Sequence, residues 1–600
     1  KIKLKDPNLP DLPYSMCKEV GYYMNYKSPW CSNVLSIFNK NGYTKFKRIE
    51  RTTLISNNIF DESLLDPKLH KVYEIQPNSF DVNVDRVFNE VIPVSKLEEY
   101  AMNNNLALDK SDIAYYTNLF GCILERDPTT MEIVDLAQCN SEHSRHWFFN
   151  GIMNINGVRE TKTLMDYIKE PLEYNRNNSA LAFKDNASAI KTDAPVIDLL
   201  PEKPNESSPY VMKEMSYLPT LNAETHNFPT GISPFPGAAT GVGGRLRDTH
   251  AIGRGGIISA GIAGYCVGNL FMEEDLHDWE STERSYQKIN GAKMLLEASD
   301  GASDYANNFG EPLIAGFCRS FGMEVTYWTL ENSVRGVEKQ QFEYIKPIMY
   351  SAGIGKVPAE SLYKEEGEPG MLIYKIGGPA YRIGIGGGSA SSRPQDAKID
   401  DLNSVQRGDP EMENRMNRLV RACAEMGSEN PIVKIHDQGA GGMANVTKEI
   451  IEPLGCDVNI DNVIVGDETL TEFEIWNAEY QEQSTILIRK ESEKLIQQIA
   501  KRENVPISCI GELNESDKIR VIDNNNTLHV DLNLSEILTN KRKKEYFIKD
   551  RREIFSELLI PTRRIQNIEF KNDLKKIFSL VSVGSKSFLT LKADRTVGGL

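Results

Sequence analysis

Two histidines, a carboxylate and an arginine gather in one short polar segment, residues 140–147 (NSEHSRHW). His143 and His146 lie three residues apart, so on a helix they could share a face and bind zinc. The order differs from His-Glu-x-x-His and no third ligand follows nearby, which disfavours zinc. A polar helix end with one hydrogen-bonded histidine is the structural alternative. We expect an acid–base or anion-contacting site.

A second segment has a Glu/His pair before a glycine cluster and an Arg/Asp pair within it. Glu224 and His226 come first, Arg247 and Asp248 follow, and eight glycines lie between 231 and 256. Glycine lets backbone N–H groups approach a ligand, so amides and guanidinium could hold a phosphate while carboxylates bind Mg²⁺. A glycine-rich turn that allows tight packing is the structural alternative. The charged pairs favour a functional site.

Three further polar segments are less specific. Residues 406–410 (QRGDP) begin a predicted helix, whose first amides could bind an anion, and 436–442 (HDQGAGG) carries a carboxylate into a glycine turn. An N-cap role for Asp409 and a turn role for Asp437 explain these two segments equally well. Residues 479–483 (EYQEQ) are uninformative alone. The sequence has neither a P-loop nor a GxGxxG pattern, so any ATP site is of another kind.

The elements that must position these segments fall into two broad types. Residues 93–130 are predicted to be helical, and Thr129 with Glu132 has the capping-box spacing that begins another helix. From 210 to 350, short apolar stretches alternate with glycine clusters and helix-like pieces, and 367–538 repeats this pattern. The alternation is typical of α/β and α+β domains.

Three local predictions follow from finer patterns. Residues 370–377 are predicted to form a strand. Asp409 and Pro410 are predicted to be the N-cap and first turn of a helix that ends near Gly427. Residues 175–205, rich in Asn, Lys, Pro and Ser, are expected to include surface loop.

Composition excludes several classes of protein. The chain has 69 Lys and Arg against 85 Asp and Glu, a formal net charge of −16, so a protein that coats nucleic acid is disfavoured. The longest uncharged run, 255–272, contains five glycines and does not resemble a membrane span. Nine scattered cysteines without a CxxC pair, and no visible signal peptide, predict a cytoplasmic enzyme.

Seven motifs together resemble those of the large, single-chain phosphoribosylformylglycinamidine synthase family. They occur in the family's order over most of residues 90–500: NSEHSRHW, ETHNFPTG, GAATGVGGRLRD, GASDYANNFGEP, GGPAYRIGIGGG, QRGDPEMENRM and HDQGAGG. The resemblance implies a ligase of purine biosynthesis. Such an enzyme converts formylglycinamide ribonucleotide, ATP and glutamine-derived ammonia into the amidine through an iminophosphate.

The resemblance also implies an architecture. It is an α/β and α+β multidomain chain, with an aminoimidazole-ribonucleotide-synthetase-like half after an N-terminal domain and a helical linker. The expected units are a shortened N-terminal domain at 1–90, the linker at 91–135, the two synthetase domains at 136–360 and 361–540, and a linker with the start of a second half at 541–600. The family's glutaminase domain would lie outside this chain, so we expect no glutamine hydrolysis by it.

The same resemblance implies roles for individual residues. Catalytic roles fall to His143 and to His226, the proton acceptor, and magnesium ligands would be Glu224, Asp248 and Asp437. Substrate contacts would be Thr225, His226, Asn227, Arg247, Gln406, Glu479 and Gln481. Nucleotide contacts would be His146, Gly237, Ala238, Ala239, Thr240, Gly241, Val242, Gly243, Gly244, Arg245, Leu246, Arg247, Asp248, Ala315, Gly316 and Phe317.

The sequence departs from the smaller-subunit relatives at three positions, Ser144, Asn222 and Phe228, of which Asn222 stands at a nucleotide-contacting lysine. Two alternatives stay open. One is another amide-phosphorylating enzyme of the superfamily, similar to aminoimidazole ribonucleotide synthetase, and the other is a truncated, non-catalytic binding piece.

Overall fold

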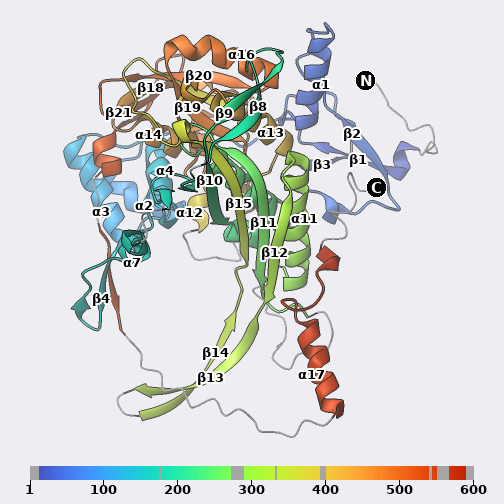
Figure 1. The fold of residues 1–600 in the computed structure, drawn as a ribbon, viewed down its shortest axis with the longest axis vertical. Coiled ribbons are helices and arrows are strands. Elements are labelled where there is room, and N and C mark those ends of the chain that lie inside the picture. The colour runs from blue at the N-terminus through green and yellow to red at the C-terminus, as the bar shows by residue number, and fades with distance from the viewer. Residues whose placement is uncertain are drawn as a thin grey trace.

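The computed structural model describes residues 13–174, 178–192, 194–271, 289–331, 334–391, 401–539, 543–549 and 567–589. Their helices and strands build two large mixed sheets, with a small N-terminal sheet on one side and short linker helices on the other (Figure 1). Of the predicted linker and start of a second half at 541–600, residues 541–542, 550–566 and 590–600 lie outside the described residues.

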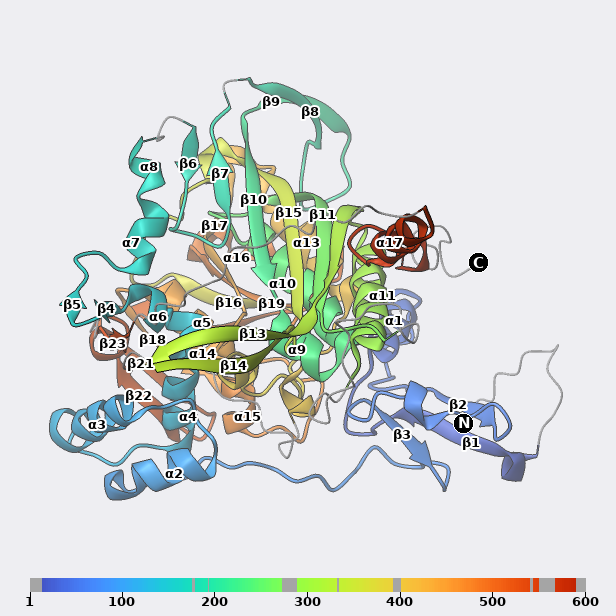
Figure 2. The same ribbon diagram turned by 90° about the horizontal axis from the view of Figure 1, so that it is seen from below.

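The N-terminal unit is a three-stranded antiparallel sheet with one helix. The strands are β1 (Cys17–Tyr22), β2 (Thr52–Ser56) and β3 (His70–Tyr73), in the order β2-β1-β3. Helix α1 (Pro29–Lys40) begins where the Ser28 side chain accepts a hydrogen bond from the Cys31 amide, with proline at the first helical position. An extended stretch then leads to the linker helices (Figure 2).

The linker helices are short and capped. They are α2 (Leu97–Asn103), α3 (Lys110–Asn118), α4 (Thr130–Cys139), α5 (Glu142–Arg145) and α6 (Trp147–Asn150). The predicted capping box of Thr129 and Glu132 is confirmed at the start of α4, and Asp109 with Asp112 makes another at α3. Every residue of α4 is buried, and the helix continues across the domain boundary predicted at 135.

The first large sheet has the strand order β12-β11-β15-β10-β7-β6. Its strands are β6 (Ser179–Leu181), β7 (Ser188–Ile190), β10 (Tyr217–Thr225), β11 (Ile257–Val267), β12 (Leu313–Ser320) and β15 (Ile348–Pro358). Helices α9 (Asn227–Ile232), α10 (Pro234–His250) and α11 (Gly291–Phe309) belong to the same unit, and α10 packs on one face of the sheet (Figure 2). Because α9 and α10 follow β10 directly, the end of that strand and both helices share one site.

The second large sheet has the order β17-β19-β16-β20-β18-β21-β22. Its strands are β16 (Leu372–Gly377), β17 (Ile432–Asp437), β18 (Gly455–Asn459), β19 (Gln483–Ile488), β20 (Ile507–Asn514), β21 (Lys518–Ile522) and β22 (Leu528–Asn533). Its helices are α12 (Gly387–Ser391), α13 (Pro410–Ala424), α14 (Gly442–Ile451), α15 (Glu472–Asn477) and α16 (Glu493–Glu503). The predicted strand at 370–377 and the predicted N-cap Asp409 are both confirmed.

Smaller elements surround the two sheets. Strand β23 (Glu545–Ile548) pairs in parallel with β4 (Ile152–Ile155), which pairs with β5 (Val158–Arg159). The hairpin β13 (Gly322–Glu331) and β14 (Val334–Glu343) projects from the body of the molecule (Figure 1). The rest are β8 (Val196–Pro201), β9 (Tyr210–Met215), α7 (Leu164–Lys169), α8 (Pro171–Tyr174) and α17 (Asn567–Ser579). Among the described residues, no helix has the length and apolar character that a bilayer crossing requires.

Candidate active site

Three carboxylates from different elements lie close together, and one asparagine contacts two of them. Glu224 lies near the end of β10, Asp248 in the last turn of α10, and Asp437 at the end of β17. The Nδ2 of Asn186 donates to Asp248 Oδ1 at 3.2 Å and to Asp437 Oδ1 at 2.6 Å. Glu224 faces α10, because its Oε2 lies 3.4 Å from the point where a Cβ on Gly244 would stand. The fold therefore brings together the three residues predicted as metal ligands.

The electrostatics of this group favour a bound cation. Burial, with the nearby charge of Asp437, raises the pKa of Glu224 to about 7 and also raises the pKa of Asp248. Burial opposes ionisation of Asp437 as well, but a hydrogen bond from His436 and the charge of Arg247 hold its pKa below the usual range. A divalent cation would relieve the repulsion among these carboxylates. The donor set fits Mg²⁺, which takes oxygen ligands and keeps several waters.

The guanidinium of Arg247 connects α10 to the second sheet. Its Nη1 donates to the carbonyl oxygens of Gln438 at 3.0 Å and Tyr480 at 3.2 Å, and also to that of Gln481. Its Nε lies 3.9 Å from Asp437 Oδ2 and has no hydrogen-bond partner in the described part of the chain. Arg247 is buried, so these carbonyls fix its position and leave a positive charge beside the carboxylates.

His226 is held as a neutral base at the start of α9. Its Nδ1 lies 2.6 Å from the carbonyl oxygen of Gly237, and because a carbonyl can only accept, Nδ1 carries the proton and Nε2 keeps a free lone pair. Burial lowers the pKa of His226 to about 4, despite that hydrogen bond. The ring is therefore neutral near pH 7 and can accept a proton at Nε2.

The segment 140–147 does not form one helix. Helix α5 ends at Arg145, and His146 has φ 51° and ψ 48°, a left-handed conformation that redirects the chain into α6. His143 and His146 therefore do not share a helix face, which removes the geometric basis for a paired zinc site. His143 lies near His226 and Glu479, since its charge contributes to the pKa of both groups.

Three predicted substrate contacts, Gln406, Glu479 and Gln481, line one pocket of about 90 Å³. Glu479 Oε1 accepts hydrogen bonds from the amides of Gly388 at 2.9 Å and Gly441 at 3.0 Å. Gln481 is 3% exposed, and neither polar atom of its side chain has a hydrogen-bond partner among the described residues. A buried polar group without a partner costs about 1–3 kcal/mol, so a ligand that pairs with this amide would be stabilised.

Comparison with known proteins identifies the relatives of this chain. It is 42% identical over 620 residues to a probable chloroplastic/mitochondrial phosphoribosylformylglycinamidine synthase of Arabidopsis thaliana, across 98% of the chain and 43% of that protein. It is 42% identical to the Dictyostelium discoideum synthase across 97% of the chain and 44% of that protein, and 37% identical to the Homo sapiens synthase across 97% and 45%. The chain is homologous to the phosphoribosylformylglycinamidine synthases. It spans less than half the length of these relatives.

Family models and a solved structure agree with this homology. Residues 97–146 match the formylglycinamide ribonucleotide amidotransferase linker domain, and 368–524 match the AIR synthase related protein, C-terminal domain. The fold is similar to that of T. maritima PurL complexed with FGAR, with a TM-score of 0.50 and 22% identity over 77% of this chain and 62% of that chain. The predicted synthetase-like α/β and α+β fold with a helical linker is thereby confirmed.

The glycine-rich segment that resembles the synthase family's ATP-binding stretch is a helix and not a turn. Residues 237–248 lie within α10, and its buried glycines allow close packing. A Cβ on Gly241 would stand 2.8 Å from His226 Cβ, and a Cβ on Gly243 would stand 2.7 Å from the ring of Tyr305. Amides in the interior of a helix bond to carbonyls of the preceding turn, so they are not available to a phosphate. The expectation of a phosphate-cradling turn is wrong in this respect.

Two predicted contact regions lie away from the carboxylates. Ser351 of β15 faces α10, because its Oγ accepts from Arg245, so the neighbouring Tyr350 points to the other face of the sheet. Phe317 contacts Tyr350, with ring centroids 5.7 Å apart, and Ala315 shares its face by alternation. Thr225 pairs with Tyr350 in the sheet, so its side chain lies on the same face as Tyr350, and it is exposed. These residues lie on the face of the sheet opposite α10.

The three departures from the smaller-subunit pattern have structural roles. Asn222 Nδ2 donates to the carbonyl oxygen of Arg245 at 2.8 Å, and its Oδ1 accepts from Thr249 Oγ1 at 3.1 Å, so this side chain is committed inside the fold. Phe228 is buried, and Ser144 Oγ lies 3.4 Å from Ser141 Oγ. The nucleotide contact of the corresponding lysine has no counterpart at Asn222.

The sequence did not reveal several residues of the site. Asn186 bridges two carboxylates, although it lies in a stretch expected to include surface loop and carries no motif. His436 Nε2 lies 3.0 Å from Oε2 of Glu449 in α14. The charge of Glu449 and hydrogen bonds to Asp437 and Glu449 raise the pKa of His436 to about 10, although burial opposes this shift. Tyr22 and Tyr26 of the N-terminal unit line the same pocket as Gln481. Only the tertiary structure brings these segments together.

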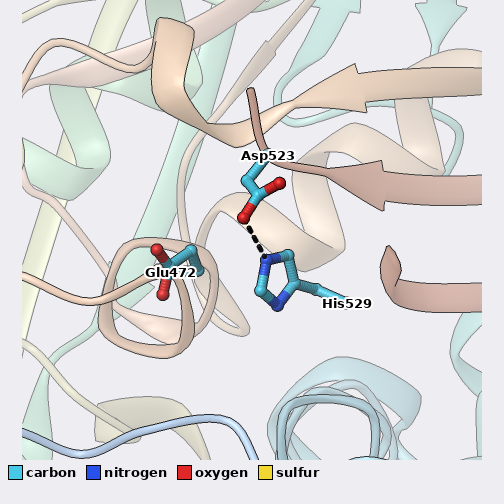
Figure 3. Close-up of side chains that lie close together, drawn as sticks. All are labelled: Glu472, Asp523 and His529. Carbon is cyan, nitrogen blue, oxygen red and sulfur yellow. Dashed lines mark ion pairs between the residues drawn. The ribbon is translucent and has the colours of Figure 1, made fainter. Parts of the chain in front are cut away.

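A separate polar cluster contains Glu472, Asp523 and His529, whose possible ligand atoms lie within 4.8 Å of one another (Figure 3). Asn89 Oδ1 accepts from the Met131 amide at 3.0 Å, so its Nδ2 faces His529 Nδ1 at 3.3 Å. Nδ1 is then the acceptor and Nε2 carries the proton, directed toward Asp523 Oδ2 at 3.6 Å. This tautomer does not offer Nε2 to a metal ion, so we assign no metal there.

Proposed function

We propose that this chain is the part of a phosphoribosylformylglycinamidine synthase that binds formylglycinamide ribonucleotide and ATP and joins ammonia to the activated amide. The proposal rests on the homology and on the convergence of Glu224, Asp248 and Asp437, with the neutral ring of His226 two residues beyond Glu224 in the chain. The linker-domain match at 97–146 favours this assignment over an aminoimidazole ribonucleotide synthetase-like enzyme.

Part of the substrate nucleotide would bind in the pocket that Gln406, Glu479 and Gln481 line. The unpartnered amide of Gln481 would pair with its polar groups, and the two glycine amides would keep Glu479 in place. Asn227 begins α9, where its Oδ1 accepts from the Met349 amide at 3.1 Å, and Thr225 ends β10 on the exposed face of the sheet. We retain them, with Arg247, as proposed substrate contacts.

Glu224, Asp248 and Asp437 would hold Mg²⁺, which would neutralise negative charge on the phosphate groups of ATP. Arg247 contributes fixed positive charge to the same place, because its Nη1 is anchored by three carbonyl oxygens. Since the interior of α10 offers no free amides, the proposed nucleotide contacts within 237–248 would come from side chains and not from a backbone cradle. His146, Ala315, Gly316 and Phe317 would contact other parts of the nucleotide.

His226 would take the proton that the attacking ammonia loses. Its Nδ1–H is anchored on the carbonyl of Gly237, which orients Nε2 and keeps it available. His143, whose charge acts on His226, would be the second catalytic residue. Ammonia would come from glutamine through a glutaminase domain, which we expect outside these 600 residues. We place the protein in the cytoplasm, consistent with cysteines that are all free.

Calorimetry with the 600-residue chain tests this function. We expect it to bind formylglycinamide ribonucleotide and, with Mg²⁺ present, ATP. Asp437→Asn should weaken Mg-dependent ATP binding at least about tenfold, which corresponds to about 1.4 kcal/mol. Asp457→Asn, an exposed carboxylate paired with Arg520 at 2.6 Å, is the matched control and should have no effect. Binding of neither nucleotide would instead support a non-catalytic piece.

A further inference from the structure

The N-terminal unit touches the loop that carries Gln406. Arg407, the next residue, forms a two-pronged ion pair with Asp66, which precedes β3: Nε lies 2.5 Å from Oδ2 and Nη2 lies 3.2 Å from Oδ1. The side chains are 8% and 20% exposed. Paired hydrogen bonds of this kind fix the plane and direction of a guanidinium, which a single contact does not.

Asp66 is itself rigidly held. Its Oδ1 accepts from the Lys68 amide at 2.8 Å, its own amide donates to His70 Nδ1 at 3.2 Å, and its carbonyl accepts from the His70 amide at 2.8 Å. The charge of Arg407 holds the pKa of Asp66 below its usual range, although burial opposes this. The carboxylate is therefore an ionised, fixed anchor on the N-terminal unit.

Arg407 passes this anchoring to the loop 401–409. Its Nη1 donates to the carbonyl of Val405, and so folds the loop back on itself around Gln406. The Asn403 carbonyl accepts from the Gly384 amide at 2.8 Å, and the Gly384 carbonyl accepts from the Glu479 amide at 2.8 Å. Hydrogen bonds, joined through the backbone of residues 403–405, thus lead from Asp66 to Gly384 and Glu479 at the pocket.

The same pocket has lining residues from the N-terminal unit. Tyr22, Tyr26 and Ser28 line it together with Gln406 and Gln481. A Cβ at Gly384 would stand 3.1 Å from Gln406 Cγ, so the loop has little free space in which to move. The position of the loop therefore sets the shape of the pocket.

We propose that Asp66 is a positioning residue for substrate binding, which through Arg407 fixes the Gln406 loop, so that the N-terminal unit forms part of the nucleotide site. This inference rests on the proposed function of that pocket. The ion pair is proposed to fix the loop 401–409. It is not needed to hold the N-terminal unit against the rest of the protein, because other contacts do so. Asn25 Nδ2 donates to Asp467 Oδ2 at 2.8 Å, and Tyr381 Oη donates to the Lys27 carbonyl at 2.7 Å.

The test compares variants of the 600-residue chain by calorimetry. Asp66→Asn keeps the shape and removes the charge, and should weaken binding of formylglycinamide ribonucleotide about tenfold. Mg-ATP binding should stay within about twofold, because the ion pair lies away from the carboxylates. Asp66→Glu, which keeps the charge, should recover most of the affinity. The control is Asn33→Ala, which removes a hydrogen bond of 2.6 Å to Glu411 and one of 2.7 Å from Arg415 at the same interface without touching the loop.

Hydrogen exchange gives a second readout, because amides of 401–409 should exchange faster in Asp66→Asn than in the unchanged chain or in Asn33→Ala. Equal substrate affinity in Asp66→Asn and the unchanged chain, or an equal loss in Asn33→Ala, would overturn the inference. Failure of the unchanged chain itself to bind the substrate nucleotide would overturn the proposed function, and this inference with it.

Discussion

At the scale of single residues, the site is built from groups that oppose folding. Glu224, Asp248 and Asp437 lie together with limited access to water, and burial raises the pKa of the first two. Ionised carboxylates in such a place lose hydration and repel one another. A bound cation would offset this repulsion and this lost hydration. When no cation is bound, the three carboxylates should lower the stability of the folded protein.

Glu224→Gln should therefore stabilise the ligand-free protein at high pH. The pKa of Glu224 is about 7 in the folded state, against 4.5 ordinarily, so the folded state binds its proton more tightly than the unfolded state. Glu224 should make the unchanged protein lose stability as pH rises from about 4.5 to 7, by roughly 3 kcal/mol at most, and the variant should lose correspondingly less. Urea unfolding at pH 5 and pH 8 measures this, and a variant equally or less stable at pH 8 would contradict it.

At the scale of elements, α10 shows how glycine serves packing. Four glycines, at 237, 241, 243 and 244, each cost a helix about 1 kcal/mol relative to alanine. Three of them lie where a Cβ would collide with neighbouring groups, so close contact with α9, α11 and the second sheet offsets the cost. The same closeness packs His226 against Gly241 of α10.

Two adjacent glycines of α10 should respond oppositely to alanine. Gly243→Ala would place a Cβ 2.7 Å from the Tyr305 ring and still closer to Gln481, and should destabilise the protein by about 2 kcal/mol. Gly244→Ala meets nothing nearer than 3.4 Å, and should be neutral or stabilising by up to about 1 kcal/mol. Thermal unfolding compares the two. Equal effects would show that helix propensity, and not space, decides at both positions.

At the scale of the whole molecule, buried polar contacts tie the units to each other. Lys448 of α14 is fully buried and forms an ion pair with Asp135 of α4, whose other carboxylate oxygen accepts from Trp476 Nε1 at 3.1 Å. Arg245 of α10 likewise pairs with Glu311, with both side chains fully buried. The first pair attaches the linker to the second sheet, and the second holds the first sheet against its helix.

Breaking the linker contact should destabilise both units together. Asp135→Asn leaves the Lys448 ammonium buried without a charged partner, and should cost about 3–5 kcal/mol in urea unfolding. Because α4 is buried against the second sheet, circular dichroism and tryptophan fluorescence should still report a single transition. Two separated transitions would show that the linker unfolds independently. Asp457→Asn, in an exposed pair, is the control and should change stability by less than about 1 kcal/mol.

The sequence by itself determined the elements and the chemistry available to them. The capping box at Thr129, the strand at 370–377 and the helix start at Asp409 depend on local hydrogen bonds and periodicity, which neighbouring residues specify. The homologous family follows from motifs that are also local. The conformation of 237–248 was not decidable in this way, because glycine permits both a turn and a helix, and only contacts with distant segments select between them.

Tertiary structure alone decided which groups meet. Asn186 reaches Asp437 across 251 residues of chain, and Asp66 reaches Arg407 across 341. Neither pairing leaves a periodic or compositional trace, since each depends on how two sheets and an N-terminal unit stack. Side chains far apart in sequence come within hydrogen-bond distance only when the apolar faces beneath them are buried against each other.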